Sequence, residues 1–189
     1  MSIALVIVDM QNDFADPNGS LFVDGGDTIT TAINAESAAT EAAGGHVYYT
    51  QDWHPPETPH FADFGGVWPI HCVRDTWGAE LRPDLDVRGP IVRKGVGGED
   101  GYSGFTMRDP ETGEEVPTEL NSLLRADGTT SVVVVGLALD VCVKATALDA
   151  VANGYDTTVL ADQSAAVNLQ PGDGDAAIEE LRAAGVTVR

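Results

Sequence analysis

The sequence predicts a doubly wound α/β domain in which a mainly parallel sheet is flanked by helices. Apolar runs rich in valine and isoleucine recur along the chain, and such continuous runs are typical of strands buried on both faces. Segments of helical periodicity lie between these runs. The 189 residues contain no linker and no internal repeat, so we expect a single domain over residues 1–189.

Six apolar runs are expected to form the strands of the sheet. The first run is too short to span a bilayer and ends at Asp9, so a strand is expected there rather than a membrane segment. The six runs are residues 3–8, 46–50, 90–92, 131–137, 156–160 and 186–188.

Helical periodicity is expected to produce the elements that connect these strands. Gly154 and Gly185 stand where helix-ending glycines belong, and Asp173 or Asp175 is expected to cap the last helix. The predicted helices are residues 28–43, 118–126, 141–153 and 175–184.

Two long segments lack a clear periodicity. Residues 52–85 are rich in proline, histidine and tryptophan, and residues 95–117 are rich in glycine and acidic side chains. Long irregular segments inside compact domains are commonly functional. The histidines and aromatic residues of the first segment lead us to expect that it contributes to a site. The acidic residues 109–115 are expected to form a solvated loop.

The composition restricts the function classes. A formal net charge of −20 at pH 7 is extreme for this size, and an acidic surface is repelled by nucleic acid and by anionic membranes. Neither is expected as a partner. The acidic excess agrees equally well with adaptation to high salt and with a genome that favours Arg and Asp, so both explanations stay open.

The cysteines, Cys72 and Cys142, form no disulfide framework, and neither a secretory signal nor a membrane-length apolar run is present. We therefore expect a cytoplasmic protein. The sequence does not decide between a monomer and a homo-oligomer.

Cys142 lies where a predicted strand turns into a predicted helix. A free cysteine in an apolar stretch is commonly a small core residue. At the start of a helix, however, free backbone N–H groups favour a thiolate and also suit an oxyanion beside the sulfur. This position therefore favours a nucleophile that attacks a carbonyl group.

Two other reactive side chains follow the ends of neighbouring strands. In open α/β sheets, ligands bind beyond the carboxyl ends of the strands, and Asp9 and Lys94 are expected at that edge together with Cys142. Lys94 would pair with Asp9 and stabilise a thiolate, while Asp9 would take the thiol proton and return it to a leaving amine. The three residues together predict cysteine acyl transfer.

A set of Asp and His residues follows the second predicted strand. Asp52 and His54 project to the same side, and His60 and His71 follow in the irregular segment. One carboxylate with imidazoles suits Zn, Fe or Mn with open positions. His46, at the opposite end of its strand, is expected to be structural.

Six motifs resemble the nicotinamidase branch of the isochorismatase-like hydrolases, in the order of that family and over nearly the whole chain. They are Asp9-Met-Gln-Asn-Asp-Phe14, Thr50-Gln-Asp-Trp-His-Pro55, Trp68-Pro-Ile-His-Cys-Val73, Arg93-Lys-Gly95, Tyr102-Ser-Gly-Phe105 and Val135-Gly-Leu-Ala-Leu-Asp-Val-Cys-Val143.

The resemblance implies a parallel six-stranded sheet and hydrolysis of nicotinamide to nicotinate and ammonia through a thioester. It implies a catalytic triad of Asp9, Lys94 and Cys142. It also implies a cis peptide bond between Leu137 and Ala138, with the N–H groups of Ala138 and Cys142 as the oxyanion hole.

A divalent metal is implied as well, with zinc as the first choice and iron or manganese as alternatives. Its ligands in this sequence would be Asp52, His54 and His71, with His60 at the ligand position where the family varies. Residues expected to contact the substrate are Phe14, Trp68, Tyr102 and Leu137. The chain departs from many relatives at Leu139 and Val141, which affects only details of the pocket.

Three alternatives remain. A metal-free amidase of the same superfamily would keep the triad and act on a carbamoyl or ureido compound, and the content of bound metal would separate it from the first reading. A signalling receiver domain also places an Asp and a Lys at strand ends, but it has no use for the histidine-rich segment. A redox sensor built on Cys142 is disfavoured because Cys72 lies in another motif.

Overall fold

One parallel sheet forms the centre of the computed structural model, which describes residues 2–189. Its strands lie in the order β3-β2-β1-β6-β7-β8, and all neighbouring strands are parallel. This order confirms the expected six-stranded α/β sheet. The strands are β1 (Ser2–Val8), β2 (His46–Asp52), β3 (Ile91–Lys94), β6 (Thr129–Leu137), β7 (Asp156–Ala165) and β8 (Thr187–Val188).

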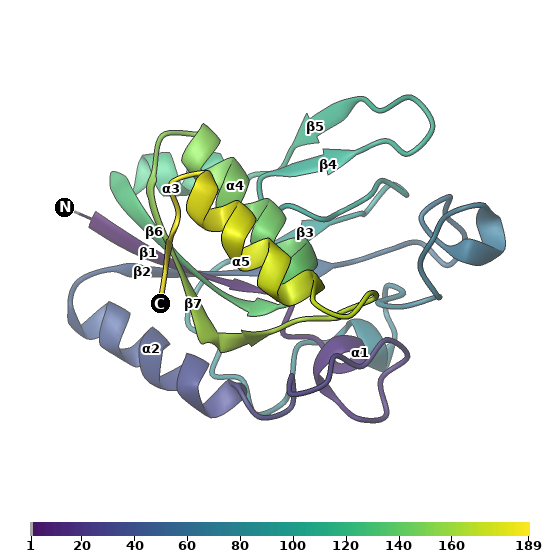
Figure 1. The fold of residues 1–189 in the computed structure, drawn as a ribbon, viewed down its shortest axis with the longest axis horizontal. Coiled ribbons are helices and arrows are strands. Elements are labelled where there is room, and N and C mark those ends of the chain that lie inside the picture. Colours follow the sequence, from purple (N-terminus) through teal and green to yellow (C-terminus); the bar gives the residue numbers. More distant parts are fainter. Residues whose placement is uncertain (1) are drawn as a thin grey trace.

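Helices cover both faces of this sheet (Figure 1). The helix α2 (Thr30–Ala42) packs on one face, and α3 (Leu120–Ala126), α4 (Lys144–Ala152) and α5 (Asp173–Ala183) pack on the other. Successive side chains of a strand point to opposite faces, and in β1 both sets are apolar. Val6 therefore joins the core beneath α3, α4 and α5, whereas Leu5 joins the core beneath α2.

Three strands continue past the carboxyl ends of the predicted apolar runs. β2 continues to Asp52, β3 to Lys94 and β7 to Ala165. The additional residues include polar side chains, so hydrophobicity alone did not mark them as strand. In β2 and β3 these are the residues that carry chemistry.

The helix predicted for residues 141–153 begins differently in the structure. A π-helical turn (Leu139–Val143) comes first, and α4 starts only at Lys144. π-Helical turns are rare and frequently occur at functional sites. Cys142 therefore lies in an irregular turn rather than in the first turn of a regular α-helix.

The predicted cap of the last helix was wrong. Gly172, the N-cap of α5, has no side chain to cap the helix, and Oδ1 of Asn168 instead accepts a 2.9 Å hydrogen bond from the first-turn N–H of Gly174. Asp173 and Asp175 both lie inside its first turn, and Asp173 instead accepts a hydrogen bond from the N–H of Gln170. The helix-ending glycines are confirmed, because Gly154 and Gly185 adopt φ values of +87° and +91° just after α4 and α5.

The irregular segments contain short elements that periodicity did not reveal. A four-residue helix, α1 (Asn12–Ala15), follows β1, and two 3₁₀ turns (Ala62–Phe64 and Trp77–Ala79) lie between β2 and β3. The acidic segment folds as a hairpin of β4 (Thr106–Arg108) and β5 (Glu115–Pro117), so only the residues between these strands form the expected solvated loop. Across residues 2–189, no helix is both long and apolar enough for a membrane span.

Candidate active site

The sheet places three charged residues side by side at its carboxyl edge. Asp52 and Lys94 end β2 and β3 and are register partners, and Asp9 directly follows β1. These strands are neighbours in the sheet, so their ends meet. The hydroxyl of Thr50 donates a 2.7 Å hydrogen bond to Oδ1 of Asp9 and fixes that carboxylate from the β2 side.

The ammonium of Lys94 connects the reactive groups. Its Nζ lies 2.7 Å from Oδ2 of Asp9, 2.5 Å from Oδ1 of Asp52 and 3.9 Å from Sγ of Cys142. It also donates to the carbonyl oxygen of Gly101. Lys94 is fully buried; the two carboxylates outweigh the cost of its burial and raise its pKa well above the usual range. Lys94 therefore stays cationic.

The two carboxylates paired with Lys94 differ in their pKa. Burial raises the pKa of Asp9 to about 6, although the charge of Lys94 opposes this shift. Burial also disfavours the charged form of Asp52, but the positive charge of Lys94 holds its pKa well below the usual range. Near neutral pH, Asp9 is thus the carboxylate able to accept and return a proton.

Cys142 is buried and faces the same group of residues. The nearest ligand atoms of Asp9, Asp52 and Cys142 lie within 4.8 Å of one another. Burial raises the pKa of the thiol well above its usual value, and the carboxylates of Asp9 and Asp52 add to the effect of burial against the opposing charge of Lys94. Burial therefore opposes the thiolate that the position of the sulfur favours. Cys142 needs an acceptor for its proton, and Asp9 is in position.

The turn before Cys142 has the expected backbone geometry. The peptide bond between Leu137 and Ala138 is cis, and the carbonyl oxygen of Ala138 accepts hydrogen bonds from the N–H groups of Val141 and Val143. Ala138 and Cys142 both line the cavity described below. The predicted oxyanion hole at these two residues stays a prediction.

Three histidines form a buried cluster beside the carboxylate of Asp52. One ring nitrogen each of His54, His60 and His71 lies within 4.8 Å of the others. Oδ2 of Asp52 is 3.7 Å from Nε2 of His54 and 4.0 Å from Nε2 of His71. The structure therefore brings all four predicted ligands together.

The donor chemistry of this cluster fits a divalent metal. Both ring nitrogens of the fully buried His54 lack a hydrogen-bond partner within residues 2–189. Burial lowers the pKa of His71 to about 4 and also lowers the pKa of His60, so both imidazoles are neutral and have a free lone pair at neutral pH. A carboxylate with neutral imidazoles matches Zn²⁺ and related ions.

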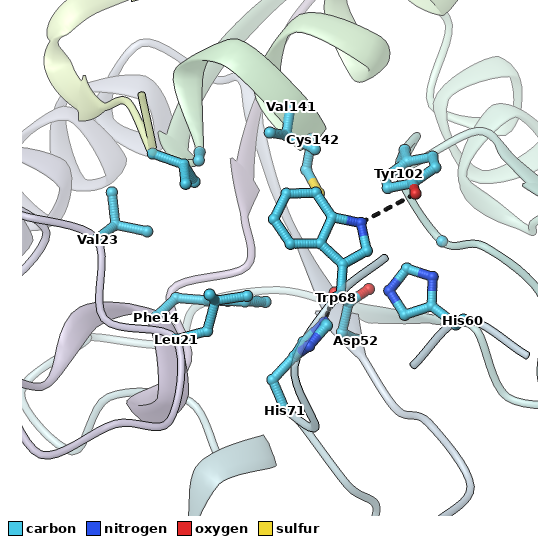
Figure 2. Close-up of a pocket in the computed structure, with 13 residues that line it drawn as sticks. Phe14, Leu21, Val23, Asp52, His60, Trp68, His71, Tyr102, Val141 and Cys142 are labelled. Carbon is cyan, nitrogen blue, oxygen red and sulfur yellow. Dashed lines mark hydrogen bonds and ion pairs between the residues drawn. The ribbon is translucent and has the colours of Figure 1, made fainter. Parts of the chain in front are cut away.

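A cavity opens between the histidine cluster and the sulfur of Cys142 (Figure 2). Phe14, Trp68 and Tyr102 line it, as the sequence predicted, and Nε1 of Trp68 donates a 3.0 Å hydrogen bond to the hydroxyl of Tyr102. Leu137 does not line the cavity; its side chain is buried in the core beneath α2. The predicted substrate contact of Leu137 therefore has no counterpart in this geometry.

The sequence analysis missed part of the cavity wall. The missed residues are Leu21, Val23 and Val167, whose apolar side chains form much of the wall together with Val141, and Figure 2 shows Leu21, Val23 and Val141 around the space. Leu21 and Val23 lie outside any helix or strand. No local sequence signal marks such residues, because only the tertiary fold brings them to the cavity.

Buried polar residues that hold the site in place were also missed. The side chain of Gln11 accepts a 2.8 Å bond from the N–H of Asp52 and donates a 2.8 Å bond to its carbonyl oxygen. Oδ2 of Asp13 accepts a 2.7 Å bond from the N–H of Cys72, next to His71. Gln11 and Asp13 both belong to the motif that begins at Asp9. Polar residues in an apolar neighbourhood were the sequence signal that could have indicated their structural role.

Comparisons with known proteins agree with this geometry. Residues 3–189 match the isochorismatase domain family. The chain is 42% identical to the nicotinamidase/pyrazinamidase of Mycobacterium tuberculosis over 188 residues, which cover 97% of this chain and 96% of that protein. A ureidoacrylate amidohydrolase of Yersinia enterocolitica is more distant, with 29% identity over 84% of this chain and 73% of its own length.

Solved structures show the same relationship. The pyrazinamidase of Pyrococcus horikoshii in complex with zinc superposes with a TM-score of 0.88 at 36% identity, over 100% of this chain and 99% of that chain. The PnC1 protein of L. infantum in complex with nicotinate superposes with a TM-score of 0.90 at 39% identity, over 100% and 92% of the two chains.

Proposed function

The chain belongs to the isochorismatase family, and we propose that it is a metal-containing cysteine amidohydrolase that converts nicotinamide to nicotinate and ammonia. The observation that carries this proposal is the position of Lys94, which contacts Asp9, Asp52 and Cys142 at once. One buried cation thus joins the groups suited to acyl transfer to the groups suited to metal binding. Both sets of groups agree with the solved relatives, of which one is in complex with zinc and another in complex with nicotinate.

In the proposed reaction, the sulfur of Cys142 attacks the amide carbonyl carbon. Asp9 takes the proton from the thiol as the carbon–sulfur bond forms, which removes the barrier set by the raised pKa of the thiol. The backbone N–H groups of Ala138 and Cys142 stabilise the oxyanion that develops on the carbonyl oxygen.

The tetrahedral intermediate then releases ammonia. Asp9 returns its proton to the departing amine, which leaves a thioester between the acyl group and Cys142. Asp9 next takes a proton from water, whose oxygen attacks the thioester carbon. As the carbon–sulfur bond breaks, Asp9 returns this proton to the departing sulfur of Cys142, which restores the thiol and the carboxylate. A carboxylate whose pKa is about 6 suits both directions of transfer near neutral pH.

The metal would be held by Asp52, His54 and His71, with His60 as the fourth protein ligand. When bound, it supplies a coordination position for the ring nitrogen of nicotinamide and so anchors the ring in a fixed orientation. Zinc is the ion we propose first, because the donor set suits it. Phe14, Trp68 and Tyr102 enclose the ring on the protein side.

The metal-free amidase is the weaker candidate. It would use the same Cys142, Asp9 and Lys94 but would leave the three buried histidines without a function. A buried polar group without a partner is costly, and His54 has two such nitrogens within the described residues. The histidine cluster therefore favours the metal-containing enzyme.

The test measures ammonia release from nicotinamide and metal content on the same preparation. We expect turnover together with about one metal ion per chain, and no turnover by the Cys142→Ala protein. A metal-free preparation with full activity on a ureido compound and none on nicotinamide would favour the alternative.

A further inference from the structure

A buried carboxylate, Asp100, lies directly behind His60. Its Oδ1 is 2.7 Å from Nδ1 of His60, and its side chain is almost inaccessible. We propose that Asp100 is a positioning residue for the metal centre and that it acts through His60. This inference rests on the metal-containing enzyme proposed above.

The carboxylate of Asp100 is held firmly in this position. Its Oδ2 accepts a 2.9 Å bond from the guanidinium of Arg108, the last residue of β4. The backbones of Asp100 and Arg108 also exchange two hydrogen bonds, of 2.7 and 2.9 Å. Asp100 therefore cannot turn away from His60 without losing contacts to the β4–β5 hairpin.

This contact decides which nitrogen of His60 is free. A carboxylate only accepts hydrogen bonds, so Nδ1 of His60 carries the proton and Nε2 keeps its lone pair. His71 is oriented in the same sense, because its Nδ1 donates a 2.7 Å bond to the carbonyl oxygen of Pro69. A carboxylate partner also makes the imidazole a more basic ligand than a carbonyl partner does. His60 thus has the stronger orienting partner of the two.

The Asp100→Asn variant tests this role with almost no change of shape. Two donors, His60 Nδ1–H and Arg108, face this side chain, and an amide offers one acceptor oxygen where the carboxylate offers two. If the oxygen stays with Arg108, the amide N–H₂ faces Nδ1 and drives the proton of His60 to Nε2. That tautomer cannot bind a metal through Nε2.

The measurement is the affinity of the metal-stripped protein for Zn²⁺ alone, with a chromophoric chelator as competitor. We expect Asp100→Asn to weaken Zn²⁺ binding by roughly 10- to 100-fold. Glu115→Gln is the matched control, because Glu115 faces Arg108 across the hairpin, is exposed, and loses the same charge. The control is expected to bind Zn²⁺ like the unaltered protein.

A double variant separates action through His60 from a general loosening of the hairpin. In a His60→Ala background, Asp100→Asn is expected to have no further effect on Zn²⁺ affinity. Unchanged affinity in Asp100→Asn, or an equal additional loss in the His60→Ala background, would overturn the inference while leaving the proposed function intact. An unaltered protein that binds no Zn²⁺ would overturn both.

Discussion

Asp52 and Lys94 are register partners at the ends of β2 and β3, and their side chains meet at 2.5 Å. Lys94 uses Oδ1 of Asp52, which leaves Oδ2 directed at the histidine cluster. The same Lys94 pairs with Asp9 on the other side. One pair of strand ends therefore couples the acyl-transfer residues to the metal ligands, so a change in either set is expected to affect the other.

Replacement of Cys142 by Ala is expected to abolish turnover and to leave the fold intact, because a small apolar residue replaces a small buried thiol. Loss of a nucleophile typically lowers kcat by about 10³-fold or more. Asp9→Asn is expected to be nearly as damaging, because an amide cannot take the thiol proton. Rates would be measured by ammonia release, with circular dichroism as the control for folding. A tenth of the normal activity in Cys142→Ala would refute the assignment of the nucleophile.

The activity is expected to fall in mild acid. Asp9 accepts the thiol proton only as a carboxylate, and its pKa in the folded protein is raised to about 6. The active form is therefore complete well above pH 6 and is lost as the pH falls through 6, with kcat/KM at pH 5 about tenfold below its plateau. Metal content at pH 5 and recovery at neutral pH are the controls. A flat profile down to pH 5 with full metal content would contradict the role of Asp9.

Loss of a histidine ligand is expected to change metal content as well as rate. His71→Ala should lower both, because its Nε2 faces Asp52 and its Nδ1 is already bonded to Pro69. Metal would be measured by elemental analysis after dialysis. His46→Ala is the matched control, since His46 lies at the opposite end of β2 and pairs with Asp127. Full metal occupancy in His71→Ala would remove this residue from the ligand set.

Much of the fold was predictable from sequence because parallel strands buried on both faces are continuous apolar runs. The charged residues at the strand ends were predictable as well, since ligands bind beyond those ends. The pKa of Cys142 was not, because burial outweighed the favourable position of the sulfur. Leu21, Val23 and Asp100 were missed because their roles depend on contacts between segments far apart in the sequence.

High salt is expected to stabilise the protein if its acidic surface is an adaptation to salinity. The chain has 30 acidic and 10 basic residues, and their net repulsion weakens as the Debye length falls to about 3 Å at 1 M salt. Melting temperatures in low and molar KCl would measure the effect. A melting temperature that is unchanged or lower in molar KCl would leave genome composition as the explanation.

The ring nitrogen of the substrate provides the sharpest test of the metal site. Nicotinamide and benzamide have nearly the same shape and the same scissile amide, but only nicotinamide offers a lone pair to a metal held by Asp52, His54 and His71. Sites built to bind a polar group reject analogues that lack it by roughly 10⁴-fold or more, whereas apolar pockets discriminate weakly. We therefore expect kcat/KM for benzamide to lie at least about 100-fold below that for nicotinamide when metal is bound.

Apolar walls formed by Leu21, Val23, Val141 and Val167 would admit both rings, so they cannot produce such a difference. Comparable rates on the two amides would show that the histidine cluster does not hold the substrate, and the metal-free amidase would then become the better description.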